Sequence, residues 1–251
     1  MRILVSNDDG IEAPGIKVLE RVARGFSDDV WTVAPETQQS AASHSLTLHR
    51  PLRIRRISRR RHAVNGTPTD CVFLAFNKIM ADSPPDLVLS GVNDGPNVGE
   101  DVTYSGTIAA AMEATLLGAP AIAFSQAYGV GRRHHWATAE QWGGRLLRTL
   151  VGSGWPERVL INVNFPDLAP GDVRGIRVAR QGLHEIADTL EERIDPRGAP
   201  YYWIGATPRE DGAGQRGTDM VAIDEGYVAV TPLHMDLTHR RTLSWLRKVI
   251  G

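Results

Sequence analysis

The stretch of sequence that decides the fold is ILVSNDDGIEAPG, residues 3–15. Three apolar residues, from Ile3 to Val5, are followed after Ser6 and Asn7 by the adjacent Asp8 and Asp9. A short apolar run that ends in turn residues is typical of a buried strand. Two carboxylates side by side repel each other unless a proton or a cation compensates their charge. The end of this strand is therefore the first candidate for a functional site.

Short apolar runs alternate with longer helical patterns beyond this stretch. We expect strands at 2–6, 30–34, 86–90, 120–125 and 159–163, and helices at 15–24, 68–80, 107–117 and 136–150. Residues 91–106 are rich in glycine and are expected to form a loop. The alternation predicts a Rossmann-like α/β fold: three α/β/α layers around a mostly parallel sheet.

The pattern changes after about residue 166, where strands at 201–204 and 227–231 follow without crossover helices. A short helix is expected at 240–250. We interpret the chain as one domain over 1–251. It has an α/β core at 1–165 and a β-rich C-terminal extension at 166–251 that serves in oligomerisation.

Composition narrows the functional classes. The chain has 251 residues and a formal net charge of -1, so no global field favours nucleic acid or an anionic membrane. Its single cysteine rules out a disulfide within the chain. No run of about 18 apolar residues predicts a membrane span. We expect a cytoplasmic protein with no membrane partner and no specific nucleic-acid partner.

A local exception to this charge balance is the segment RIRRISRRR, residues 53–61, which contains six arginines. The run predicts a projecting hairpin with a solvated cationic face. It also leaves open a local interaction with a polyanion.

Polar residues follow several of the predicted strands. In an open parallel sheet, ligands bind beyond the carboxyl ends of the strands. The candidates at that edge are Asp8, Asp9, Ser40, Asn93, Asn97, Ser105, Gly106 and Thr107. Several of these segments also suit simple turns, since Asn-Asp-Asp-Gly and Asn-Asp-Gly favour them. Their common edge favours the functional interpretation.

The candidate residues suggest two partners. Carboxylate, hydroxyl and amide oxygens suit a hard divalent cation such as Mg²⁺ or Mn²⁺, and we expect one per subunit. The helix entry at 105–107 presents free N–H groups and suits a phosphate. Together they predict metal-assisted hydrolysis of a phosphoester. Asp8 or Asp9 also suits a general base, and the sequence does not separate them.

Other classes fit the same region less well. A dinucleotide-binding enzyme needs G-x-G-x-x-G after the first strand, where this chain has Asn-Asp-Asp-Gly. An aspartyl-nucleophile phosphatase usually has two aspartates separated by one residue. A phospho-receiver domain needs an aspartate after a middle strand, where this chain has Ser90 and Asn93. A non-catalytic nucleotide-binding or phospho-regulatory protein stays open as the alternative.

These motifs resemble the SurE family of metal-dependent nucleotidases. The resemblance is carried by NDDGIEAPG (7–15), APETQQSAASHS (34–45), NGTPTDCV (65–72), LVLSGVNDGPNVGEDVTYSGTIAAAMEA (87–114) and GTDMVAIDEGYVAVTPLHMDLT (217–238). It spans nearly the whole chain.

The resemblance implies a function and a set of roles. Asp8, Asp9, Ser40 and Asn93 match the family's metal ligands, and Asn97 with 105–107 matches positions around the bound phosphate. The implied reaction is hydrolysis of nucleoside 5′- and 3′-monophosphates, with short polyphosphate as a further substrate of some members. The implied assembly is a homodimer or homotetramer. The stretch at 180–203 is less diagnostic of the family. The resemblance therefore says least about which nucleoside base the protein prefers.

Overall fold

The computed structural model describes residues 1–129, 131, 134–183, 188–206 and 215–251. Within this part of the chain, nine strands form one sheet and two form a separate hairpin. The strands of the main sheet are β1 (Arg2–Ser6), β2 (Asp29–Pro35), β3 (Ile54–Ser58), β4 (Arg61–Val64), β5 (Leu87–Asp94), β6 (Ala121–Gln126), β7 (Val159–Phe165), β8 (Ile176–Val178) and β11 (Val228–His234).

The order of the main sheet is β3-β4-β2-β1-β5-β6-β7-β11-β8. The strands from β4 to β7 are all parallel, while β3 pairs with β4 and β11 with β7 in antiparallel fashion. Its middle, with β1 between β2 and β5, is a run of parallel strands whose carboxyl ends lie at one edge. The mostly parallel sheet predicted from the sequence is confirmed.

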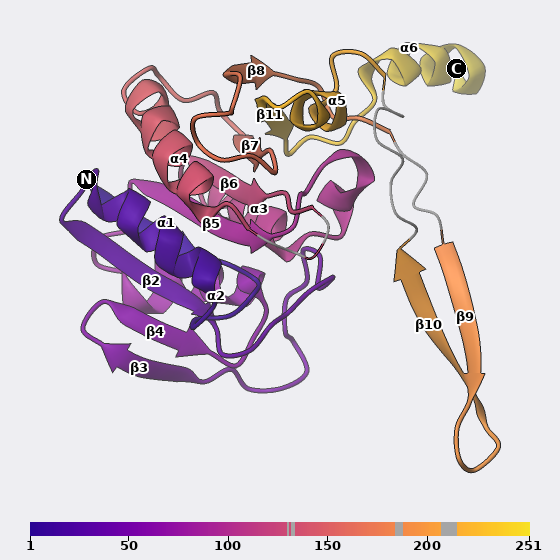
Figure 1. Cartoon of the computed structure of the whole chain (residues 1–251), viewed down its shortest axis with the longest axis horizontal. Helices are drawn as coiled ribbons and strands as arrows, with labels where there is room; N and C mark the ends of the chain where they lie inside the picture. Colours follow the sequence, from indigo (N-terminus) through magenta and orange to yellow (C-terminus); the bar gives the residue numbers. More distant parts are fainter. Residues whose placement is uncertain (130, 132–133, 184–187, 207–214) are drawn as a thin grey trace.

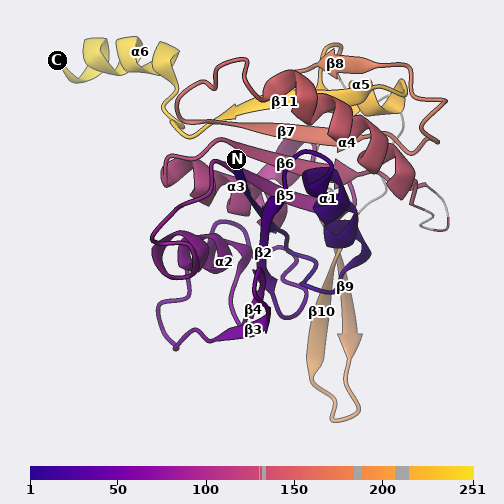
Figure 2. The same ribbon diagram turned by 90° about the vertical axis from the view of Figure 1, so that its left-hand side faces the viewer.

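Helices cover both faces of the sheet, as Figures 1 and 2 show. On one face lie α1 (Pro14–Arg24) and α4 (Trp136–Leu150), and on the other lie α2 (Pro68–Leu74) and α3 (Gly106–Leu116). Each face has its own buried core. Phe124 and Phe165 belong to the first, and Ile108 belongs to the second. The predicted three-layer arrangement is therefore confirmed.

Local sequence signals explain where several helices begin. Thr67 accepts a hydrogen bond from the backbone N–H of Asp70, and the Asp70 side chain accepts one from Thr67 N–H. This capping box, with Pro68 at the first helical position, starts α2 as the sequence predicts. The helical segment expected to reach residue 80 ends as a π-helical turn, Ala75–Ile79.

The loop predicted at 91–106 is wrong in part. Strand β5 continues to Asp94, because Asn93 and Asp94 pair with Ser125 and Gln126 of β6 after an irregularity in the register. A 3₁₀-helix, η2 (Gly99–Thr103), follows before α3 begins. Pairing with a neighbouring strand has overridden the local preference of a glycine-rich sequence for turns.

The C-terminal part is divided between the main sheet and two projecting elements. Strands β11 and β8 extend the main sheet, and α5 (Asp219–Asp224) packs beside β11. The hairpin of β9 (Asp188–Ile194) and β10 (Pro200–Ala206) stands away from the body, as does α6 (Arg240–Ile250) (Figure 1). No helix among the described residues is long and apolar enough to cross a membrane.

Candidate functional site

The carboxyl edge of the sheet brings the end of β1 next to the end of β5. Ser6 pairs with Ser90 in the parallel ladder, so the chain leaves both strands at the same place. Asp8 and Asp9 follow β1, and Asn93 and Asp94 end β5. The backbone N–H of Asp94 donates a hydrogen bond to Asp9 Oδ2 at 3.1 Å. The two strand ends are thus directly connected.

Asp8 is buried against the start of α3. The hydroxyl of Thr107 donates a hydrogen bond to Asp8 Oδ1. Gly106 lies so close that a Cβ added to it would be 2.7 Å from Asp8 Cβ and 2.9 Å from Asp8 Oδ2. The absence of a side chain at Gly106 therefore allows the helix N-terminus to contact the aspartate.

The two aspartates are in an environment that disfavours their charge. Burial raises the pKa of Asp8 to about 6, with the bond from Thr107 opposing and the charge of Asp9 adding to the shift. Burial also raises the pKa of Asp9, against the hydrogen bond from Asp94. A pair of desolvated carboxylates is stabilised by a proton or a cation.

Asn93 and Ser40 lie near the same edge. The side-chain nitrogen of Asn93 donates to Gly95 O at 2.9 Å, so its oxygen is the atom that it can offer to a cation. Gln39 N–H donates to Asp8 O at 2.8 Å, which holds the loop carrying Ser40 beside the aspartates. Ser40 is exposed, and its hydroxyl accepts a hydrogen bond from Gln38 Nε2.

The loop with Ser40 is tied to the segment around α3. Ser43 donates through its hydroxyl to Thr103 O at 2.8 Å. His44 Nε2 lies 2.9 Å from Glu113 Oε2, and Glu113 is buried on α3. His44 therefore pairs with a carboxylate of the helix and holds the Ser40 loop in place.

Asn97 and the start of α3 supply hydrogen-bond donors. Asn97 Nδ2 donates one hydrogen to Ser125 Oγ at 2.8 Å and has a second one. Ser105 caps α3 by accepting from Ile108 N–H at 3.1 Å. The N–H groups of Gly106 and Thr107 belong to the first helical turn, which cannot satisfy them within the helix. These groups suit an anion next to Asp8.

The donor set fits a hard divalent cation. The segments that carry the two carboxylates, the Asn93 amide and the Ser40 hydroxyl meet at this edge, and these are the kinds of ligand that Mg²⁺ and Mn²⁺ accept. Among the described residues no group of three or more His, Cys, Asp or Glu is arranged to hold a metal ion. A cation here would thus depend on the two aspartates and on neutral oxygens.

Several residues of this region were missed at the level of sequence. His134 Nε2 lies 2.6 Å from Asp94 Oδ1, and its ring stacks on Trp136. Asn164 pairs with the backbone of Asn97 on both sides: its oxygen accepts from Asn97 N at 2.7 Å, and its nitrogen donates to Asn97 O at 3.0 Å. The alternating asparagines of INVNF, residues 161–165, are a signal that could have indicated such a role.

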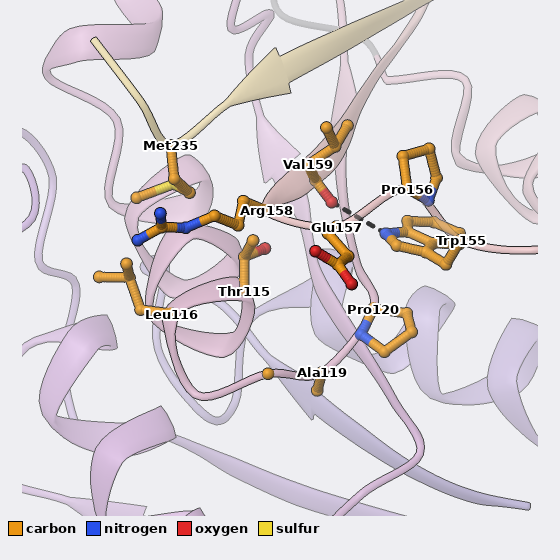
Figure 3. A pocket seen from close by; sticks show the side chains of 11 residues that line it. Thr115, Leu116, Ala119, Pro120, Trp155, Pro156, Glu157, Arg158, Val159 and Met235 are labelled. Carbon is orange, nitrogen blue, oxygen red and sulfur yellow. Dashed lines mark hydrogen bonds between the residues drawn. The ribbon is translucent and has the colours of Figure 1, made fainter. Parts of the chain in front are cut away.

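A pocket, whose lining residues are drawn in Figure 3, lies at the amino ends of β6 and β7. Its volume is about 350 Å³, and its lining includes Trp155, Arg158 and Met235. The pocket is bordered by the start of β7 and the C-terminal end of α3. The candidate site residues lie instead near the N-terminal end of α3 and the carboxyl ends of the strands. This hollow does not belong to the site.

A mostly parallel sheet covered by helices on both faces, with paired carboxylates and a helix N-terminus at its carboxyl edge, defines this chain as a Rossmann-like α/β protein. A family model described as "Survival protein SurE" matches residues 3–188. The chain belongs to the SurE family.

Similar proteins support this assignment over the full length. A protein of Paramagnetospirillum magneticum named 5'-nucleotidase SurE is 58% identical over 240 residues, covering 96% of this chain and 92% of the relative. One of Parvibaculum lavamentivorans with the same name is 54% identical and covers 100% of this chain and 91% of the relative. The crystal structure of the SurE protein from Aquifex aeolicus has a TM-score of 0.88 at 39% identity and covers 100% of both chains.

Proposed function

We propose that this chain is a metal-dependent nucleotidase that hydrolyses nucleoside 5′- and 3′-monophosphates to a nucleoside and phosphate. The observation that carries the proposal is the contact between Asp8 and the start of α3 at Gly106 and Thr107. A cation site and an anion site share this contact. The names of the similar proteins support a 5′-nucleotidase activity.

Asp8, Asp9, Ser40 and Asn93 would hold one divalent cation, Mg²⁺ or Mn²⁺. When bound, the cation supplies positive charge that polarises a phosphoryl oxygen and lowers the pKa of a water ligand. It also offsets the electrostatic cost of placing buried Asp8 beside half-buried Asp9. This cost is visible in the raised pKa values of Asp8 and Asp9.

The remaining groups bind and orient the phosphate. Asn97, Ser105 and the first N–H groups of α3 donate hydrogen bonds to its oxygens, and the helix dipole adds to the attraction. Thr107 donates to Asp8 and so holds that carboxylate in place. Asp8 or Asp9 also acts as the general base that accepts the proton of the attacking water, and the proposal does not choose between the two.

We extend the proposal to the assembly and the location of the chain. The extension at 166–251, beside the core at 1–165, exposes apolar side chains on β10 and α6, among them Tyr202, Trp203 and Trp245. These surfaces suit a homodimer or homotetramer.

The single, buried Cys71 suits a reducing cytoplasm. Short polyphosphate is a proposed further substrate, because it presents the same terminal phosphate.

The test is phosphate release from a panel of 5′- and 3′-nucleoside monophosphates and a short polyphosphate. Purified protein is assayed with Mn²⁺, with Mg²⁺ and with excess EDTA. We expect turnover that requires metal and falls at least about 100-fold in Asp9→Asn. Asp172→Asn is the matched control, because Asp172 is an exposed aspartate outside the site.

Two outcomes contradict the proposal. Full activity of Asp9→Asn without added metal means that the cation site is assigned wrongly. Folded wild-type protein with no turnover on any substrate supports the alternative, a non-catalytic nucleotide-binding or phospho-regulatory protein.

A further inference from the structure

We propose that Asp219 and Gln181, two residues of the C-terminal extension, position the phosphate-binding loop through Gly99. The phosphate-binding loop is defined here as residues 95–105, which join β5 to α3 and contain Asn97 and Ser105. This inference rests on the proposed function, because it concerns how the same site holds phosphate.

Side chains of the extension form hydrogen bonds with both the N–H and the C=O of Gly99. The N–H of Gly99 donates to Asp219 Oδ2 at 3.1 Å. Gln181 Nε2 donates to Gly99 O at 2.8 Å. Gly99 is buried and has a φ of 55°, a left-handed conformation that favours glycine. The loop is therefore fixed at one peptide position by side chains that come from far along the chain.

Asp219 is fully buried and does more than contact the loop. Its Oδ1 accepts hydrogen bonds from Gly182 N–H at 2.8 Å and from Met220 N–H at 2.9 Å. One carboxylate thus takes three N–H groups. It joins the two segments from which the β9–β10 hairpin extends, 180–183 and 215–219, to the phosphate-binding loop.

Apolar packing strengthens the same connection. Val98, next to Gly99, is buried in a cluster with residues of the extension, including Ala179, Met220 and Ile223. Polar and apolar contacts therefore act on neighbouring residues of the loop. Without the extension this part of the loop would be open to water.

The constraint at Gly99 reaches the start of α3 through η2. Asp101 N–H donates to Val98 O at 3.1 Å, and Ser105 N–H donates to Asp101 O at 3.0 Å. This series of bonds sets the position of Ser105 relative to Gly99. All four proposed cation ligands, Asp8, Asp9, Ser40 and Asn93, lie outside the loop. The segment that carries Ser40 is bonded to the loop through Ser43 at Thr103 and Tyr104, away from Gly99. A loosened Gly99 should therefore affect phosphate binding more than cation binding.

Asp219→Asn is the first test, since it keeps the shape of the side chain. An amide offers one acceptor oxygen where the carboxylate has two. If the oxygen keeps the bonds from Gly182 and Met220, the amide NH₂ faces the N–H of Gly99 and that bond is lost. Gln181→Leu removes the donor on the other side of Gly99. Gln181 is half-buried, so this variant is the safer one for folding.

The readouts separate phosphate from metal. We expect KM for a nucleoside monophosphate and the inhibition constant of inorganic phosphate to rise about fivefold to tenfold in both variants. The Mn²⁺ concentration for half-maximal activity should stay within about twofold of wild type. Calorimetric titration of inorganic phosphate into the Mn²⁺-loaded protein gives a binding readout without turnover. Asp172→Asn is the control for the loss of a carboxylate in the extension.

Three results would overturn the inference. One is an unchanged phosphate constant in folded Asp219→Asn and Gln181→Leu. Another is an equal loss of phosphate and Mn²⁺ affinity, which indicates general destabilisation. The third is a loss of phosphate affinity that accompanies a fall in oligomeric mass, measured by light scattering. If Asp219→Asn does not fold, the result for Gln181→Leu alone decides. A wild-type protein without turnover contradicts the proposed function instead, whatever the variants show.

Discussion

Gly106 is the residue at which the proposed cation site and the proposed phosphate site meet. Because a Cβ there would lie 2.7 Å from Asp8 Cβ, Gly106→Ala must push the start of α3 away from the aspartate. We expect a loss of stability of about 1–3 kcal/mol. We also expect a fall in kcat/KM on the order of 100-fold, since a misplacement of about 1 Å has such an effect on oriented groups. Steady-state kinetics and thermal unfolding measure the two losses.

Gly144→Ala is the matched control for this substitution. The nearest atom to its added Cβ is the flexible end of Arg148 at 3.7 Å, which is an ordinary contact. Alanine is also the better helix former inside α4. This variant should therefore be as stable as wild type or more so, with unchanged kinetics. Equal kinetics of Gly106→Ala and wild type would show that Gly106 does not set the geometry of the site.

Single residues also show how far the sequence could predict the candidate site. Asp8, Asp9 and Gly106 could be placed at one edge, because they follow strands or begin a helix next to them. Asp219 and Asn164 could not be connected to the loop. Their partners lie 120 and 67 residues away in sequence, and only the folded sheet brings them together. A side chain that hydrogen-bonds to the backbone of a distant residue leaves no recognisable pattern in the sequence around it.

At the scale of an element, β4 carries a buried imidazole. His62 stacks on Trp31 of the neighbouring strand with ring centroids 6.3 Å apart, and its Nδ1 has no hydrogen-bond partner among the described residues. Burial lowers the pKa of His62, and the charge of Arg56 adds to this shift. The folded protein therefore binds a proton at His62 less readily than the unfolded chain does.

The sign of the pH effect follows from this lowered pKa. Stability from neutral His62 is complete above the unfolded pKa of about 6.5 and is lost as the pH falls below that value. His62→Phe keeps the stacked ring and removes the titrating group. Its melting temperature should fall less than that of wild type between pH 7.5 and pH 5.5. Parallel curves for the two proteins would contradict this role of His62.

Elements differ in how well the sequence predicted them. The helix at 136–150 matches α4 at both ends, because its apolar residues recur on one face and the flanking sequence does not continue the pattern. The strand expected at 86–90 extends to Asp94. Its last residues are polar and follow a glycine, so their pairing with β6 depends on a tertiary neighbour and not on local preference.

For the whole molecule, α6 provides the clearest test of assembly. None of its residues, all of which are described, is buried, although Leu243, Trp245, Leu246 and Val249 are large and apolar. Leu246→Glu should lower the molar mass in light scattering at least twofold and make the melting temperature less dependent on protein concentration. The fold of the monomer should persist.

Arg241→Glu is the control, since it changes a charge on the same helix at an exposed polar position. It should leave the mass unchanged. If Leu246→Glu has the mass of wild type, then α6 does not take part in assembly. The expected role of the extension would then depend on the β9–β10 hairpin alone.

The two outer strands of the main sheet have a consequence for solubility. Unpaired strand edges are templates on which other chains can add, and charged side chains or short strands protect against this. All five residues of β3 are exposed, and β3 lies in the arginine run, whose Arg55 and Arg60 pair with Glu36 and Asp29. The other outer strand, β8, has only three residues. The charges of the arginine run are therefore expected to keep other chains from adding a strand at the β3 edge of the sheet.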